Sequence, residues 1–91
     1  MNVRWTPKAL SDVARLYDFL APINKEAAVR IIQTIVATPN GLMEHPRIGE
    51  PLEEFRPREV RRILVGRYEI RYEIKDSTIR VLRVWHTRED R

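Results

Sequence analysis

The sequence predicts an α+β fold of the order β-α-α-β-β-β, in which a helical hairpin packs on one face of a small antiparallel sheet. Two patterns predict it. Apolar residues recur every three or four positions through residues 7–38, and at every second position through residues 68–75. The 91 residues, 43% of them hydrophobic, are enough for one core, so residues 1–91 are expected to form a single domain.

The first helix follows a short extended segment around Val3 and Trp5. Thr6 before Pro7 predicts its start, because a hydroxyl caps a free backbone N–H and proline suits the first helical position. The helix is expected to end before Pro22, since proline disfavours the helical conformation of the residue before it. Its predicted apolar stripe consists of Leu10, Val13, Ala14, Tyr17 and Ala21.

A second helix is predicted to begin at Asn24, another N-cap residue. Residues 39–41, Pro-Asn-Gly, are expected to end it, because proline cannot continue a helix and glycine tolerates left-handed dihedral angles. The short connection between the two helices predicts an antiparallel hairpin. The apolar side of this helix is expected to comprise Ala27, Ala28, Ile31, Ile32, Ile35 and Val36.

The remaining chain is predicted to form a long loop and three strands. Residues 42–57 hold three prolines and one glycine and are expected to be a loop with at most one helical turn. Strands are expected at residues 62–65, 68–75 and 78–86, with a short turn at 76–77. Tyr68 and Tyr72 are expected in the core, and Arg67, Arg71 and Lys75 on the opposite, solvent-facing side of the sheet.

Positive charge is concentrated near the C-terminus. The net charge is +4, but residues 1–55 carry −1 and residues 56–91 carry +5. A one-sided cationic surface favours an anionic partner: a nucleic acid, an acidic protein or a membrane surface. The alternative is a solvated face that pairs with its own glutamates. The candidate partner-binding residues are Arg61, Arg62, Arg67, Arg71, Lys75, Arg80, Arg88 and Trp85, and the cationic set also includes Arg83 and Arg91.

Composition excludes several kinds of site. The chain has no cysteine and two histidines, which excludes disulfides, thiol catalysis and cysteine-ligated metals and leaves too few imidazoles for an all-histidine zinc site. No cofactor and no metal are therefore expected. Neither a signal peptide nor a membrane span is visible, so a cytoplasmic protein that does not enter a membrane is expected.

Four segments, in this order and spacing, resemble toxins of the RelE/ParE superfamily, especially its ParE branch. They are residues 5–12 (WTPKALSD), 46–51 (PRIGEP), 60–72 (VRRILVGRYEIRY) and 81–90 (VLRVWHTRED). The resemblance implies the toxin of a bacterial type II toxin–antitoxin system, of the kind that serves plasmid stabilisation. ParE-like toxins inhibit DNA gyrase by trapping it with cleaved DNA. A ParD-like antitoxin with an acidic C-terminal segment neutralises them in a heteromeric complex. The leading expectation is therefore a gyrase-binding toxin that is not an enzyme.

A RelE-like, ribosome-dependent mRNA endoribonuclease is the main alternative. His86 would then be the general acid or base, Glu53 or Glu54 a second base, and Arg62 and Arg83 the phosphate clamps. RelE-like nucleases generally use a terminal tyrosine or several lysines, whereas this chain has no aromatic residue after Trp85 and only three lysines. A third alternative is a non-toxic binding module that acts only with its antitoxin in repression.

Three placements stay open in the sequence. Arg83 alternates with both apolar and polar neighbours, so its side of the sheet is not assigned. Trp85 fits either the core or a partner anchor. The outer face of the helical hairpin could cover the sheet alone or also contact gyrase, and its polar residues are Lys8, Asp12, Arg15, Lys25 and Arg30.

Overall fold

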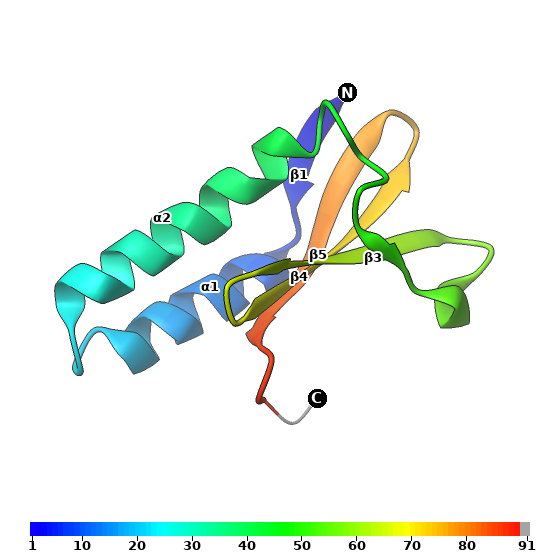
Figure 1. Ribbon diagram of the computed structural model, residues 1–91. Helices are drawn as coiled ribbons and strands as arrows, with labels where there is room; N and C mark the ends of the chain where they lie inside the picture. Colours follow the sequence, from blue (N-terminus) through cyan, green and yellow to red (C-terminus); the bar gives the residue numbers. More distant parts are fainter. Residues whose placement is uncertain (90–91) are drawn as a thin grey trace.

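The computed structural model describes residues 1–89 (Figure 1). Its elements in chain order are β1 (Asn2–Trp5), α1 (Pro7–Leu20), α2 (Lys25–Gly41), β2 (Glu50–Pro51), the 3₁₀ helix η1 (Glu53–Phe55), β3 (Glu59–Val65), β4 (Tyr68–Lys75) and β5 (Thr78–His86). The predicted order of helices and strands is confirmed, and the long loop contains the short elements β2 and η1 in addition.

The strands form one five-stranded sheet in the order β1-β5-β4-β3-β2. Neighbouring strands are antiparallel except β1, which runs parallel to β5. The sheet is therefore mixed, because the first strand lies beside the last and runs in the same direction. Local alternation in the sequence predicts a strand but carries no information about the direction of a neighbour 76 positions away, such as Val3 beside Ile79.

Both helices cover one face of the sheet (Figure 1). Helix α1 lies against β5, and α2 reaches β3. Tyr72 is fully buried on this face in a second cluster with Leu42 and Ile79, and Tyr68 packs against the main core, so the expectation of core tyrosines is confirmed. The main core cluster consists of Ala9, Leu16, Ile35, Ile70, Val81 and Val84.

Helix α1 begins as the sequence predicts. The Thr6 hydroxyl accepts a hydrogen bond from the Ala9 N–H at 3.1 Å. The predicted apolar stripe is displaced, however: Leu10 is 56% exposed, whereas Ala9, Asp12 and Leu16 are buried. The expectation that Asp12 lies on the exposed side of the helical hairpin is thus wrong. Hydrogen bonds between its carboxylate and β5 decide which side of the helix faces the sheet, and apolar spacing alone could not show them.

Helix α2 begins after Asn24, whose side chain accepts a hydrogen bond from the Ala27 N–H at 3.0 Å, as predicted. It does not stop before Pro39 but continues to Gly41. Proline removes one backbone donor in the last turn only, and its ring is buried against the rest of the domain. Packing therefore extends the helix past a residue that normally ends one.

A β-bulge in β5 assigns the side on which Arg83 lies. The register of β4 and β5 shifts between Arg71 and Tyr72: Arg71 lies opposite Arg83, but Tyr72 lies opposite Val81, which leaves Leu82 as the extra residue. Because of this extra residue, Val81 and Val84 can both face the helices. Arg83 consequently lies on the sheet face away from the helices, here called the outer face.

Candidate functional site

The outer face carries a stack of guanidinium groups and aromatic rings. The Arg71 guanidinium carbon lies 4.8 Å from the centre of the Trp85 ring and 5.4 Å from that of Phe55. The guanidinium carbon of Arg83 lies 5.0 Å from the centre of the same Trp85 ring. Trp85 is only 5% exposed although it faces away from the helices. Cation–π contacts thus cover a large aromatic side chain on this face.

Two glutamates are buried on the same face. Glu69 is 1% exposed and pairs with Arg62 at 3.4 Å and with Arg71 at 3.1 Å. Glu73 is 4% exposed; Arg58 binds it through two hydrogen bonds of 3.0 Å, and Arg80 lies 3.8 Å away. Each of these carboxylates pairs with two guanidiniums, and Arg62 is shared with Glu50 at 2.9 Å. With Lys75 included, the face keeps an excess of positive charge.

The guanidiniums also fix the ionised state of one of these glutamates. The hydrogen bonds from Arg58 lower the pKa of Glu73 below its usual range, and the charges of Arg58, Arg80 and Lys75 act in the same direction. Burial opposes them and is outweighed. Glu73 is therefore a permanent anion in neutral solution, and part of the cationic surface is already neutralised within the chain.

The structure divides the candidate partner-binding residues among four places. Arg62, Arg71, Lys75, Arg80 and Trp85 lie on the outer face. Arg67 lies in the turn between β3 and β4, and Arg88 lies in the segment after β5, so the expectation of Arg67 on the sheet face is wrong. Gly66 and Arg67 together form the turn between Val65 and Tyr68, so Arg67 is not part of the alternation of side chains along β4. Arg91 lies outside the described residues.

Arg61 points to the other face of the sheet and holds the preceding loop. It lies opposite Tyr72, and its guanidinium donates to the carbonyl oxygens of Gly49 at 2.7 Å and Arg47 at 3.1 Å. Its side chain is only 17% exposed and also pairs with Glu59. Arg61 is thus a structural clamp on the loop, which its position in a basic sequence run did not reveal.

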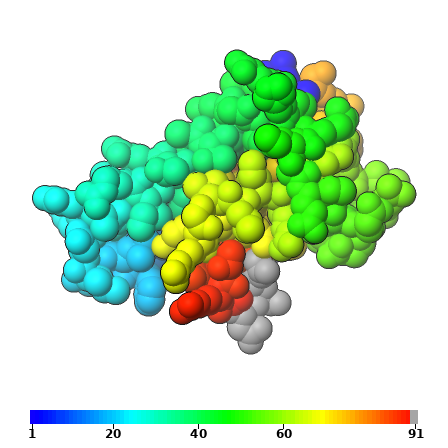
Figure 2. Space-filling view, in the orientation of Figure 1, coloured from blue at the N-terminus to red at the C-terminus, as the bar shows by residue number. Residues whose placement is uncertain are grey.

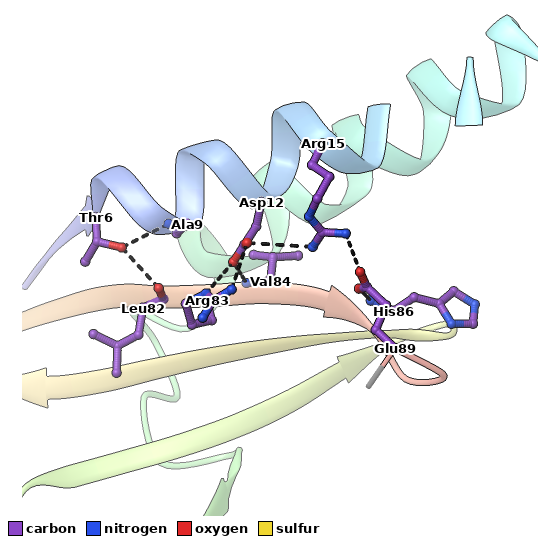
Figure 3. Close-up of polar contacts among 9 residues, drawn as sticks. All are labelled: Thr6, Ala9, Asp12, Arg15, Leu82, Arg83, Val84, His86 and Glu89. Carbon is purple, nitrogen blue, oxygen red and sulfur yellow. Dashed lines mark hydrogen bonds and ion pairs between the residues drawn. The ribbon is translucent and has the colours of Figure 1, made fainter. Parts of the chain in front are cut away.

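Asp12 seals the edge of β5 at the point where β1 ends (Figure 3). Its carboxylate accepts two hydrogen bonds from Arg83, at 2.7 and 3.1 Å, and one from the Val84 N–H at 2.9 Å. Arg15 lies 3.7 Å from Asp12 and forms a second ion pair with Glu89. Helix α1 thereby binds the strand edge and also the segment that follows it.

These contacts set the charge of Asp12. Burial would raise its pKa, but the hydrogen bonds from Arg83 and from the Val84 N–H, with the charges of Arg83 and Arg15, lower it below its usual range. The carboxylate is accordingly ionised at neutral pH. Sequence reasoning missed Asp12 as a site residue because its partners are more than 70 positions away.

The residues of the nuclease alternative do not converge. His86 lies opposite Tyr68 on the helix side of the sheet, with ring centres 5.2 Å apart and an edge-to-face arrangement. In Figure 3 its imidazole points away from Arg83. Arg62 and Arg83 lie on the outer face. Glu53 is exposed on η1 and pairs with its neighbour in that turn, Arg56.

Two apolar grooves flank the Tyr68–His86 pair. The first, of about 560 Å³, lies between α2 and the β3–β4 turn; the second, of about 570 Å³, lies between α1 and residues 88–89. Figure 2 shows the face on which the β3–β4 turn lies between α2 and the red C-terminal segment. Phe19, in the second groove, is 68% exposed. Exposed apolar area of this kind is typical of interaction surfaces, and the charge pattern alone did not indicate it.

The grooves have cationic rims. Arg30 and Arg67 border the first groove. Arg15 and Arg88 border the second together with Glu89, which pairs with Arg15. Within residues 1–89, no group of three or more potential ligand side chains is placed to hold a metal ion. In the same part of the chain, no helix has both the length and the apolar character of a membrane span.

Comparison with known proteins identifies the family. A family model described as "ParE toxin of type II toxin-antitoxin system, parDE" matches residues 3–91. The chain belongs to the ParE toxin family. It is a toxin of the ParE/RelE group of type II toxin–antitoxin systems. The resemblance inferred from four short segments is therefore confirmed along nearly the whole chain.

Relatives from both branches of the superfamily are similar to this ParE-family chain. Toxin RelE2 of Caulobacter vibrioides is 30% identical over 85 residues, which cover 93% of each chain. The structure titled "Chromosomal ParDE TA system from P. aeruginosa" gives a TM-score of 0.79 at 26% identity, covering 94% of this chain and 95% of that one. The RelBE2 toxin–antitoxin complex from Mycobacterium tuberculosis gives 0.67 at 30% identity, covering 93% and 95%.

Proposed function

We propose that this ParE-family toxin acts by binding and not by catalysis: it inhibits DNA gyrase by trapping the complex of gyrase with cleaved DNA. A ParD-like antitoxin with an acidic C-terminal segment neutralises it in a heteromeric complex. The family match supports the toxin role. The position of His86 is the observation that favours binding over RNA cleavage.

His86 is occupied by structural contacts. Its Nδ1 accepts a hydrogen bond from the Arg88 N–H at 3.0 Å, and its ring packs edge-on against Tyr68. A general acid or base in RNA cleavage must reach the same phosphodiester as the cations that stabilise it. His86 and the two candidate clamps, Arg62 and Arg83, lie on opposite faces of the sheet. This arrangement supports a protein that holds its target instead of cutting RNA.

The antitoxin proposal rests on charge and exposed apolar area together. The outer face has more guanidiniums than carboxylates, and the two grooves join apolar walls to arginine rims. An acidic, amphipathic segment that folds on binding matches both features. The two solved structures compared above carry titles of a toxin–antitoxin system or complex, which supports the same kind of partner here.

A RelE-like activity is the second candidate, because two of the similar proteins carry RelE or RelBE names. Expression of this chain alone in bacteria separates the candidates. Gyrase inhibition predicts filamentous cells with an induced DNA-damage response while protein synthesis continues. Ribosome-dependent cleavage predicts an immediate loss of protein synthesis that His86→Ala relieves. Normal growth would identify the third alternative, a module that acts only in repression with its antitoxin.

A further inference from the structure

The free end of the helical hairpin carries exposed apolar side chains. Phe19, in the last turn of α1, is 68% exposed, and Ile23, in the connection to α2, is 76% exposed. Among the large apolar residues of the described chain, no other side chain is as exposed as these two. Contact of such side chains with water costs free energy that a bound partner recovers. This end of the hairpin, residues 18–26, is here called the hairpin tip.

The hairpin tip projects from the domain. The molecule is elongated, with extents of 40 × 26 × 22 Å. Figure 1 shows the connection between α1 and α2 at the end of the hairpin that extends beyond the sheet. Phe19 and Leu20 also line the second groove with Leu16, so the apolar surface continues from the tip along α1. A projecting apolar end of this kind fits a recess in a larger folded protein.

The charges beside the hairpin tip largely cancel. Arg15, at the rim of the second groove, pairs with Asp12 and with Glu89. Arg88 is the other cation of that rim. Residues 18–26 themselves contain two carboxylates and one ammonium group, a net charge of −1. The tip therefore offers no excess of positive charge to a phosphate backbone or to an acidic peptide.

The first groove differs from the tip in its charge. Arg30 and Arg67 stand at its rim, and none of the described residues that line it has a carboxylate. An acidic antitoxin segment is thus attracted to the first groove more than to the hairpin tip. The tip matches a partner whose contact surface is apolar and carries little net charge.

We propose that the hairpin tip is the surface through which this toxin contacts gyrase. Phe19 and Ile23 anchor in an apolar recess of a gyrase subunit, and Leu20 extends the same contact toward the second groove. Large apolar anchors of this kind, and aromatic ones above all, contribute most of the binding energy of many interfaces. The inference rests on the proposed function for the identity of the target and adds the surface that holds it.

Purified gyrase and plasmid DNA test the hairpin tip with matched variants. Ile23→Asp places a charge where the contact is apolar, and Ile48→Asp makes the same change at a residue of similar exposure, 67%, in the loop before β2. Phe19→Ala removes the aromatic anchor, and Leu10→Ala is its control near the exposed start of α1. The toxin concentration for half-maximal inhibition of supercoiling should rise at least about tenfold for the tip variants and less than about threefold for the controls.

Two further measurements keep the test independent of folding defects. Thermal unfolding of each free variant shows whether it is folded; all four positions are exposed, so all four variants are expected to fold. Hydrogen exchange of the unaltered toxin, with and without gyrase and plasmid, is expected to slow at residues 19–24 in the complex. If a tip variant does not fold, this protection decides the question.

The outcomes separate the surface from the target. Inhibition by the unaltered toxin that both tip variants retain in full would overturn the tip contact and leave gyrase as the target. Absence of inhibition by the unaltered toxin would contradict the target and the contact together. Loss of antitoxin binding in both tip variants, with gyrase inhibition unchanged, would assign the tip to the antitoxin. A dimer of the unaltered toxin that Ile23→Asp converts to a monomer, measured by light scattering, would assign it to a second copy.

Discussion

The carboxylate of Asp12 receives both hydrogen bonds of the Arg83 guanidinium, although the two residues are 71 positions apart in the chain. The pair joins the first helix to the last strand at a point where no strand within residues 1–89 pairs with that side of β5. It also holds one member of the stack of rings and guanidiniums on the outer face, because Arg83 covers Trp85. This one contact therefore links helix α1, strand β5 and the ring and guanidinium stack of the outer face.

Removal of the Asp12 carboxylate should destabilise the protein strongly. Asp12→Ala leaves the Val84 N–H and the Arg83 charge without their partner, and we expect the free energy of unfolding to fall by about 2–4 kcal/mol. Asp18 is exposed on the same helix, so Asp18→Ala should change it by no more than about 0.5 kcal/mol. Urea unfolding of both variants measures the difference; equal effects would show that the pair contributes nothing particular.

The contribution of Asp12 should depend on pH in a defined direction. Its pKa in the folded protein lies below its usual value, so its stabilising effect is complete above the unfolded-state pKa of about 3.9. The effect is lost as the pH falls through the folded-state pKa. The difference in unfolding free energy between the natural chain and Asp12→Asn should be constant from about pH 5 to 7 and shrink below about pH 4. A difference that grows on acidification would contradict this assignment.

A methyl group at Gly49 should disrupt the loop between α2 and β2. A Cβ there would lie 2.5 Å from the Tyr72 hydroxyl and 2.7 Å from the Arg62 carbonyl oxygen. Gly49→Ala is expected to lower the unfolding free energy by about 1–3 kcal/mol. Gly41 at the end of α2 has open space around it, so Gly41→Ala is the matched control and should be near neutral. A stable Gly49→Ala variant would show that the loop adjusts.

Some features of the fold could be predicted from local sequence. Thr6 and Asn24 start the helices they were expected to start, and the alternation from Tyr68 to Lys75 is one strand. Each of these depends on residues within a few positions of one another. The strand end at residue 65 likewise follows from the turn at Gly66, whose φ of 58° suits glycine.

Other features depend on tertiary contacts and were missed for that reason. The bulge at Leu82 breaks the alternation that would have placed Arg83. The buried face of α1 is selected by Asp12, whose partners lie in β5. Arg61 was grouped with exposed cations because its neighbours in sequence are basic, yet the loop folds over it. The pattern of residues along the chain contains no information about these long-range contacts.

Charge reversal on the exposed cations should weaken the antitoxin complex. Arg71 is held between rings, so changing it would also perturb the sheet, whereas Arg67 and Arg80 are exposed. We expect Arg67→Glu combined with Arg80→Glu to reduce antitoxin affinity by about tenfold at low salt and less at high salt. Lys8→Glu combined with Lys25→Glu, at the exposed starts of α1 and α2, changes the net charge by the same amount and is the control. Calorimetric titration at two salt concentrations measures it, and an unchanged salt dependence would exclude these cations from the interface.

The claim that this toxin acts by holding gyrase is tested most directly with purified components. DNA gyrase, supercoiled and relaxed plasmid and the isolated toxin are combined, and both supercoiling and covalently trapped cleaved DNA are measured. The account predicts inhibited supercoiling and accumulated cleaved DNA, both preserved in His86→Ala and both reversed by the antitoxin. Full supercoiling with no trapped cleavage, alongside toxin-dependent cutting of mRNA on ribosomes that His86→Ala abolishes, would contradict it.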